Sequence, residues 1–195
     1  MARPDDFAQT QPLSRAEWRQ WLAAHHAGSP GVWFTYFKKE TGRPRVSYDE
    51  AVEEALCFGW VDSLPRKLDA ERSMLLFTPR KPRSGWSKIN KERIARLEAA
   101  GLLLPAGRAA IETAKKNGAW TSLDAAEAGE VPPALAAALA ADPAAEAQFK
   151  AFSLSSRKMI LTWYGAAKRP ETVAARTAEI VRMAALGKRA NVDKA

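Results

Sequence analysis

The sequence predicts an α+β protein, in which helices pack on a small antiparallel sheet and a C-terminal helical segment follows. Three observations predict this class. The run VWFTYF at residues 32–37 is rich in aromatic and β-branched residues, as buried strands are. Two further apolar runs, residues 60–64 and 74–78, flank a polar turn, which is typical of an antiparallel pair. The other segments show the apolar spacing and capping residues of helices.

Capping residues place the first helices. Ser14 with Glu17, and Ser47 with Glu50, have the spacing of a capping box, in which each side chain accepts a hydrogen bond from the other residue's backbone N–H. The two boxes predict that one helix begins after Ser14 and another covers residues 48–58.

Prolines and glycines place the next helices. Pro79 and Pro82 lack a backbone N–H and disfavour helix in the preceding residue, so the chain between the last strand and the next helix should be extended. A helix is expected at residues 87–100, and another begins at Pro105 and ends at residues 117–118.

The composition changes at Thr121. Residues 121–143 are rich in alanine and contain four acids and three prolines, which predicts a short helix between hinges. Ser155 or Ser156 should cap the next helix, and Pro170 should open the last one. We therefore expect three parts: an α+β domain at residues 1–120, an Ala/Pro-rich linker at residues 121–145 and a C-terminal helical hairpin at residues 146–195.

Positive charge is concentrated in one part of the chain. The formal net charge is +8. Residues 66–96 contain ten Lys or Arg and three acids, a surplus of seven, whereas the rest of the chain carries a surplus of one. Such a block indicates an anionic partner. The alternative is a solvated face that binds nothing.

The helix expected to follow Ser87 has Lys88 and Lys91 in its first turn, where exposed N–H groups favour acids. An anion bound to these N–H groups would remove the conflict. Trp86 could stack on a base or sugar, or could be a core residue. The ligand-binding residues expected in the basic segment 77–96 are Arg80, Lys81, Arg83, Trp86, Ser87, Lys88, Asn90 and Lys91.

Asp62 is the candidate acid or base, although an ion pair with Lys67 would also explain it. Cys57 has no histidine near it in sequence and is expected to be buried. His25 and His26 point about 100° apart on a helix, so no metal site is expected. The sequence contains no nucleotide-binding glycine motif, and we expect no cofactor. No catalytic residue is predicted.

With one cysteine, the chain cannot form an internal disulfide, which fits a reducing compartment. Its longest run of small apolar residues is too short to cross a bilayer. We therefore expect a cytoplasmic protein that does not insert into membranes.

Several segments resemble one known family. EALCFGWVDS at residues 54–63, FTPRKPRSGWSKINKER at 77–93 and AKRPET at 167–172 resemble the YdeI or OmpD-associated family, also named for bacteriocin protection. GRAAIETAKKNGAW at residues 107–120 resembles it too, and the resemblance runs from about residue 31 to residue 186. Members are grouped with a CyaY-like or YjbR-like superfamily, so the resemblance implies a sandwich of helices on an antiparallel sheet. It implies no catalytic residues.

Two functions stay open. The first is a non-enzymatic module that binds a polyanion or nucleic acid through the basic segment, for which about five neutralised phosphates give a log–log salt slope of about −4.5. The alternative is a small-molecule binder or enzyme that acts on a phosphorylated or carboxylated ligand in a pocket between sheet and helices. A protein partner in stress protection, as the family name suggests, is a third expectation.

Overall fold

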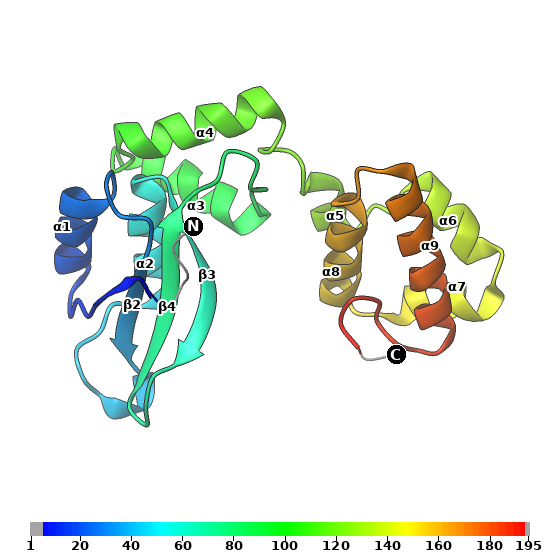
Figure 1. Ribbon diagram of the computed structural model, residues 1–195, viewed down its shortest axis with the longest axis horizontal. Coiled ribbons are helices and arrows are strands. Elements are labelled where there is room, and N and C mark those ends of the chain that lie inside the picture. The colour runs from blue at the N-terminus through cyan, green and yellow to red at the C-terminus, as the bar shows by residue number, and fades with distance from the viewer. Residues whose placement is uncertain (1–5, 194–195) are drawn as a thin grey trace. The chain divides into compact units, whose positions relative to one another are not determined.

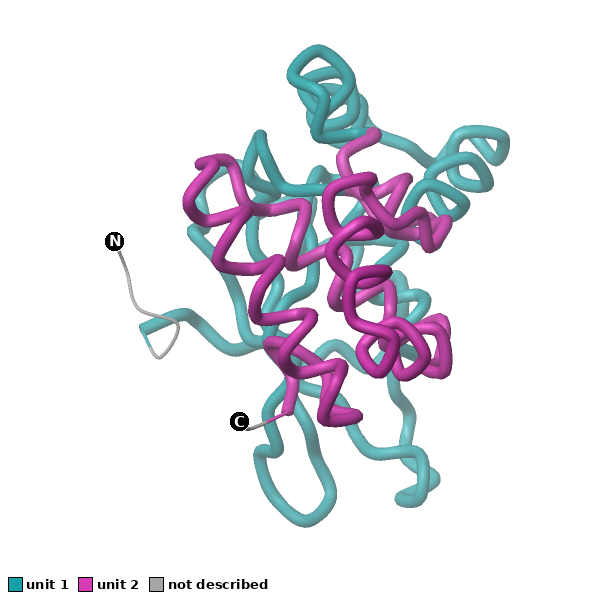
Figure 2. The backbone as a smooth tube through the Cα atoms, turned by 90° about the vertical axis from the view of Figure 1, so that its right-hand side faces the viewer, with its two compact units in different colours: residues 1–85, 89–120 teal, residues 86–88, 121–195 magenta. Residues whose placement is uncertain are grey.

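The structure, a computed structural model, describes residues 6–193. It divides into two compact units, shown in different colours in Figure 2. Unit 1 comprises residues up to 85 and residues 89–120, and unit 2 comprises residues 86–88 and those from 121 onward. Unit 1 has a sheet with helices and unit 2 has helices only, so the α+β class with a C-terminal helical segment is confirmed.

A four-stranded sheet with the order β1-β2-β4-β3 forms the centre of unit 1 (Figure 1). The strands are β1 (Ala8–Thr10), β2 (Val32–Phe37), β3 (Trp60–Lys67) and β4 (Arg72–Pro79). β4 pairs antiparallel with β2 and β3, and these three strands are the predicted ones. β1 was not predicted and pairs parallel with β2. Its three residues are too few to show an alternating pattern.

The first helices begin at the predicted caps. The helices of this part of the chain are α1 (Arg15–His25), α2 (Tyr48–Cys57), α3 (Lys88–Ala99) and α4 (Pro105–Asn117), with a short 3-10 helix η2 (Lys39–Thr41). Ser47 and Glu50 form the complete capping box. Ser14 accepts a bond from the N–H of Glu17, but the Glu17 carboxylate accepts from the N–H of Leu13, one residue before the cap.

Trp18 joins α1 to the sheet. Its ring centroid lies 4.8 Å from that of Phe34 in β2 and 5.3 Å from that of Phe77 in β4. Its indole N–H donates to the carbonyl oxygen of Ala51 in α2 at 3.0 Å. One buried side chain of α1 therefore contacts β2, β4 and α2.

A buried carboxylate ties α1 to α2. Glu54, which is 2% exposed, accepts a bond from Nε of Arg15 and another from Nη1 of Arg19, each at 2.6 Å. A charge this deeply buried needs such partners, because desolvation costs several kcal/mol per ion. The two arginines therefore fix the orientation of α1 on α2.

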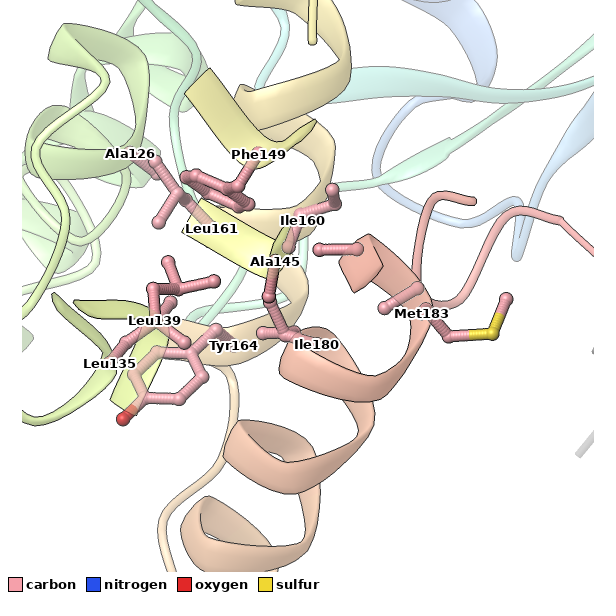
Figure 3. Close-up of a cluster of buried hydrophobic side chains, with 12 residues drawn as sticks. Ala126, Leu135, Leu139, Ala145, Phe149, Ile160, Leu161, Tyr164, Ile180 and Met183 are labelled. Atoms are coloured by element: carbon pink, nitrogen blue, oxygen red, sulfur yellow. The ribbon is translucent and has the colours of Figure 1, made fainter. Parts of the chain in front are cut away.

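In the described part of unit 2, the helices after residue 120 are α5 (Asp124–Ala128), α6 (Pro133–Ala140), α7 (Pro143–Ala151), α8 (Leu154–Gly165) and α9 (Pro170–Ala185). Figure 3 shows their common core, in which Leu135 and Leu139 of α6 lie among Phe149, Ile160 and Ile180. Residues 121–145, where a linker with one short helix was expected, thus contain α5, α6 and the start of α7 and contribute core side chains. The two leucines, four residues apart, form a buried apolar face of α6. Because the rest of the helix is mostly alanine, this face does not stand out in the sequence.

The start of α8 differs from the expected one by two or three residues. Ser153 is the N-cap, and its hydroxyl accepts a bond from the N–H of Ser156 at 3.2 Å. The reason is local: α7 ends at Ala151, and the backbone of Phe152 is extended. Ser153 is therefore the first serine that can cap the next helix.

Candidate functional site

Three of the predicted site residues belong to one connected polar cluster in unit 1. Asp62 lies in β3, Arg80 follows β4, and Asn90 lies in α3. Interactions of Tyr48, Asp49 and Arg93 connect Asp62 with Asn90, and the charge of Asp62 acts on Arg80. We call these six residues the Arg80 cluster: Tyr48, Asp49, Asp62, Arg80, Asn90 and Arg93.

Tyr48 and Asp62 form the first contact of the cluster. Tyr48 is the first residue of α2, and its hydroxyl donates to Oδ2 of Asp62 at 2.9 Å. Partial burial, followed by the negative charge of Asp62 and this hydrogen bond, raises the pKa of Tyr48 to about 12. The phenol is therefore a proton donor at neutral pH, and it orients the Asp62 carboxylate.

Arg80 brings a largely buried positive charge to the same place. Its backbone N–H donates to the carbonyl of Gly59 at 2.9 Å, and its Nη2 donates to the carbonyl of Gly85 at 2.5 Å. Burial lowers the pKa of Arg80 to about 10, and the nearby charge of Asp62 opposes this shift. The guanidinium is still charged at neutral pH, but burial penalises its charge.

Arg93 is the second arginine of the cluster, and it is only 4% exposed. It forms an ion pair with Asp49, and its Nη1 donates to Oδ1 of Asn90 at 2.9 Å. Its guanidinium carbon lies 5.7 Å from the ring centroid of Tyr48. Asn90 was expected to bind ligand, but its side-chain oxygen accepts a hydrogen bond from Arg93.

The other expected residues of the basic segment do not form one site within a unit. Lys81 and Arg83 are exposed in unit 1, and neither forms an ion pair with another residue between 6 and 193. Lys91 lies over the ring of Trp120, with its ammonium 5.4 Å from the centroid. Trp86, Ser87 and Lys88 belong to unit 2, and Trp86 is 1% exposed, which favours the core alternative over stacking on a ligand.

The helix after Ser87 begins at Lys88, as predicted. The backbone N–H of Lys88 lies 3.4 Å from Oε1 of Glu127, and Oε2 of Glu127 forms an ion pair with Lys158 at 3.2 Å. A carboxylate of the chain itself therefore lies where an external anion was expected. This contact could not be predicted from the sequence, because Glu127 is 39 residues away from Lys88.

Sequence reasoning missed Tyr48, Asp49 and Arg93. The only available signal was local: Tyr48 and Asp49 follow the N-cap Ser47 directly, so both lie in the first turn of α2. Nothing in the sequence shows that Arg93, 44 residues later, reaches Asp49.

Residues 6–193 give little support for a reactive cysteine, a metal site or a membrane-spanning helix. Cys57 is fully buried, and burial, followed by the charge of Glu54, raises the pKa of its thiol. Within this range, no three His, Cys, Asp or Glu side chains lie together as metal ligands would. No helix in the described part of the chain has the length and apolar character needed to cross a membrane.

Comparisons with known proteins separate the two parts of the chain. Residues 128–187 match the family model described as Bacteriocin-protection, YdeI or OmpD-Associated, which supports the resemblance seen in AKRPET. The segments at residues 54–63 and 77–93 instead lie in a match to a second family model, over residues 10–110. Searches of curated proteins and of solved structures found no match. Since the second match covers more than half of the chain, the protein belongs to the family described as Domain of unknown function (DUF8412).

Proposed function

We propose that this protein is an anion-binding module, and that its ligand is a small molecule with a carboxylate or phosphate that contacts the Arg80 cluster. The observation that carries the proposal is the largely buried guanidinium of Arg80, whose pKa is lowered to about 10. An anion beside this group would offset the cost of burying its charge. Guanidinium groups also match carboxylates and phosphates with two parallel hydrogen bonds.

The surroundings of Arg80 support a small ligand. Tyr48 holds the Asp62 carboxylate by a hydrogen bond, and Asn90 and Asp49 hold Arg93. These groups are fixed by their own contacts, and fixed groups lose little freedom when a ligand binds. Asp62 is also the acid or base that the sequence suggested for a reaction here, but the proposal is for binding.

A polyanion is the second candidate. It is favoured by Lys81 and Arg83, which are exposed and form no ion pair within residues 6–193. Against it, Arg93 is paired with Asp49 and Trp86 is buried, so fewer groups of the basic segment are available than its composition suggests. The match to the bacteriocin-protection family gives no ligand, and the grouping with the CyaY-like superfamily and the cytoplasmic location stay predictions.

An NMR titration of the full chain tests the proposal, with inorganic phosphate and succinate as probes. We expect amide shifts around Asp62 and Arg80 for at least one probe, and their loss in Arg80→Met. Lys81→Met is the matched control, because it removes an exposed cation next in sequence and should leave the shifts unchanged.

A second experiment measures the affinity for a short single-stranded oligonucleotide at several salt concentrations. A log–log slope of about −4.5, with affinity lost in Lys81→Met and retained in Arg80→Met, would favour the polyanion over the small ligand. If neither probe nor oligonucleotide shifts amides near Arg80, the proposal is wrong.

A further inference from the structure

A basic pocket lies at the other end of the sheet from the Arg80 cluster. In the pairing of β3 with β4, Trp60 opposes Pro79 at the end next to Arg80, and Lys67 opposes Ser73 at the end next to the turn. Figure 1 shows this turn extending away from α3 and α4. The pocket at the turn has a volume of about 310 Å³ and is lined by Tyr36, Lys38, Pro65, Arg66, Lys67 and Ser73. We call it the hairpin pocket.

Strand pairing places three of the polar groups on one face of the sheet. Ser73 in β4 pairs with Tyr36 of β2 on one side and with Lys67 of β3 on the other. Directly opposed residues project from the same face. Two hydroxyl groups and an ammonium therefore form a row across three neighbouring strands, and the sequence alone does not reveal this row.

Neutral groups contact two of the cations of the pocket. Nζ of Lys38 donates to the carbonyl oxygens of Asp69 at 3.1 Å and Ala70 at 2.6 Å. These bonds hold the ammonium but leave its charge in place, and an ammonium has three N–H groups. The guanidinium carbon of Arg66 lies 4.7 Å from the ring centroid of Trp33, which holds that side chain against the sheet.

Acids of the pocket wall do not cancel the charges of Lys38 and Lys67. Among the described residues, no Asp or Glu lines the pocket. The two acids of the adjoining turn have cations of their own: Asp69 is bonded by Arg72 at 2.8 Å and 2.7 Å, and Glu71 is paired with Arg43 at 3.4 Å. The hydrogen bond from Arg72 lowers the pKa of Asp69, as expected for a carboxylate already engaged by another cation.

We propose that the hairpin pocket binds a small phosphate monoester in its dianionic form. A monoester carries a charge of nearly −2 at neutral pH and has three strong acceptor oxygens. Lys38 and Lys67 supply two positive charges, and the hydroxyls of Tyr36 and Ser73 supply neutral hydrogen bonds. The volume is at the lower end of the range for ligand pockets, which suits a single phosphate on a small organic group. A phosphodiester carries only one negative charge per phosphate, so it would balance only one of the two lysine charges.

This site is independent of the Arg80 cluster, so each can be tested without the other. The probes are phenyl phosphate and phenyl sulfate, which have the same ring and differ by one charge near neutral pH. In an NMR titration of the full chain, we expect phenyl phosphate to shift the amides of Tyr36, Lys67 and Ser73. Phenyl sulfate should bind about tenfold more weakly, as the loss of one charge-assisted interaction predicts.

Lys67→Gln tests the pocket directly, because Lys67 is exposed and its removal should leave the melting temperature unchanged. It should weaken phenyl phosphate binding about tenfold. Lys116→Gln, an exposed cation of α4, is the matched control and should have no effect. Arg80→Met should also leave this binding unchanged, which separates this inference from the proposed function.

Three results of the titrations with unmodified protein would overturn the inference. They are equal affinity for the two esters, amide shifts that avoid the hairpin, and tighter binding of a single-stranded oligonucleotide than of phenyl phosphate at the same amides. A Lys67→Gln variant that binds phenyl phosphate as the unmodified protein does would overturn it as well.

Discussion

The hydroxyl of Tyr48 donates a hydrogen bond of 2.9 Å to Asp62, and this bond joins the first residue of α2 to β3. It orients the Asp62 carboxylate. The negative charge of this carboxylate favours the charged form of the Arg80 guanidinium. The bond also couples the protonation of the phenol to the folded state, because the charge of Asp62 opposes ionisation of Tyr48.

Stability should therefore fall at alkaline pH through Tyr48. Its folded-state pKa of about 12 lies above the ordinary value of 10.0, so the unfolded chain loses this proton first. The contribution is complete below about pH 10 and is lost as the pH rises to about 12. Denaturation by urea across this range should show a shallower decline for Tyr48→Phe than for the unmodified protein.

An ultraviolet titration of phenolate absorbance gives an independent measurement. Tyr48→Phe should delete a component that ionises at about pH 12. Superimposable titration curves for the two proteins would show that the hydrogen bond to Asp62 does not protect this phenol.

Arg80→Met should change the free energy of unfolding by no more than about 1 kcal/mol. The variant loses the hydrogen bond to the carbonyl of Gly85, which is worth about 1 kcal/mol. It also removes a buried charge whose pKa is lowered to about 10, and replacing a buried ion by an apolar group of similar size is often neutral or stabilising. Urea denaturation at neutral pH checks this. A loss above about 3 kcal/mol would mean that Arg80 serves the fold.

Cys57 should be unreactive in the folded protein. The side chain is fully buried, and burial raises the pKa of its thiol, so the reactive thiolate is scarce and inaccessible. Ellman's reagent should label one thiol per chain in denaturant and almost none in native buffer. Rapid labelling of the native protein would contradict both the burial of Cys57 and the packing of α2.

The fold was predictable where one segment contains its own signal. The run at residues 32–37 forms β2 with the expected bounds, and Ser47 with Glu50 forms the expected capping box. The strand β1 and the core role of α6 were not predictable in this way. β1 depends on pairing with β2, and α6 depends on partners in α7 to α9 that receive Leu135 and Leu139.

The candidate site shows the same division. Charge density pointed to Arg80, and the carboxylates on either side of Lys67 pointed to Asp62, so these residues could be chosen from the sequence. Tyr48 and Arg93 could not, because their roles arise when α2, β3 and α3 come together. The hairpin pocket depends wholly on strand register, which brings Tyr36 and Lys67 to either side of Ser73.

Gly107→Ala should destabilise unit 1 through a backbone clash. Gly107 lies in the first turns of α4, and a Cβ at this position would stand 2.6 Å from the carbonyl oxygen of Cys57 and 2.7 Å from that of Leu56. Neither oxygen can rotate away as a side chain could, so α4 must move off the end of α2. Overpacking of this kind costs about 1–3 kcal/mol, which exceeds the gain of about 0.5–1 kcal/mol from alanine in a helix.

The matched control is Gly28→Ala, because a Cβ there meets no atom within 4 Å and the backbone is not left-handed. Urea denaturation should show a change of less than about 0.5 kcal/mol for Gly28→Ala and a clear loss for Gly107→Ala. A gain in stability for Gly107→Ala would mean that α4 does not sit against the carbonyl end of α2. The packing at Gly59, where an added Cβ would stand 2.9 Å from the carbonyl oxygen of Ala106, would then be in question as well.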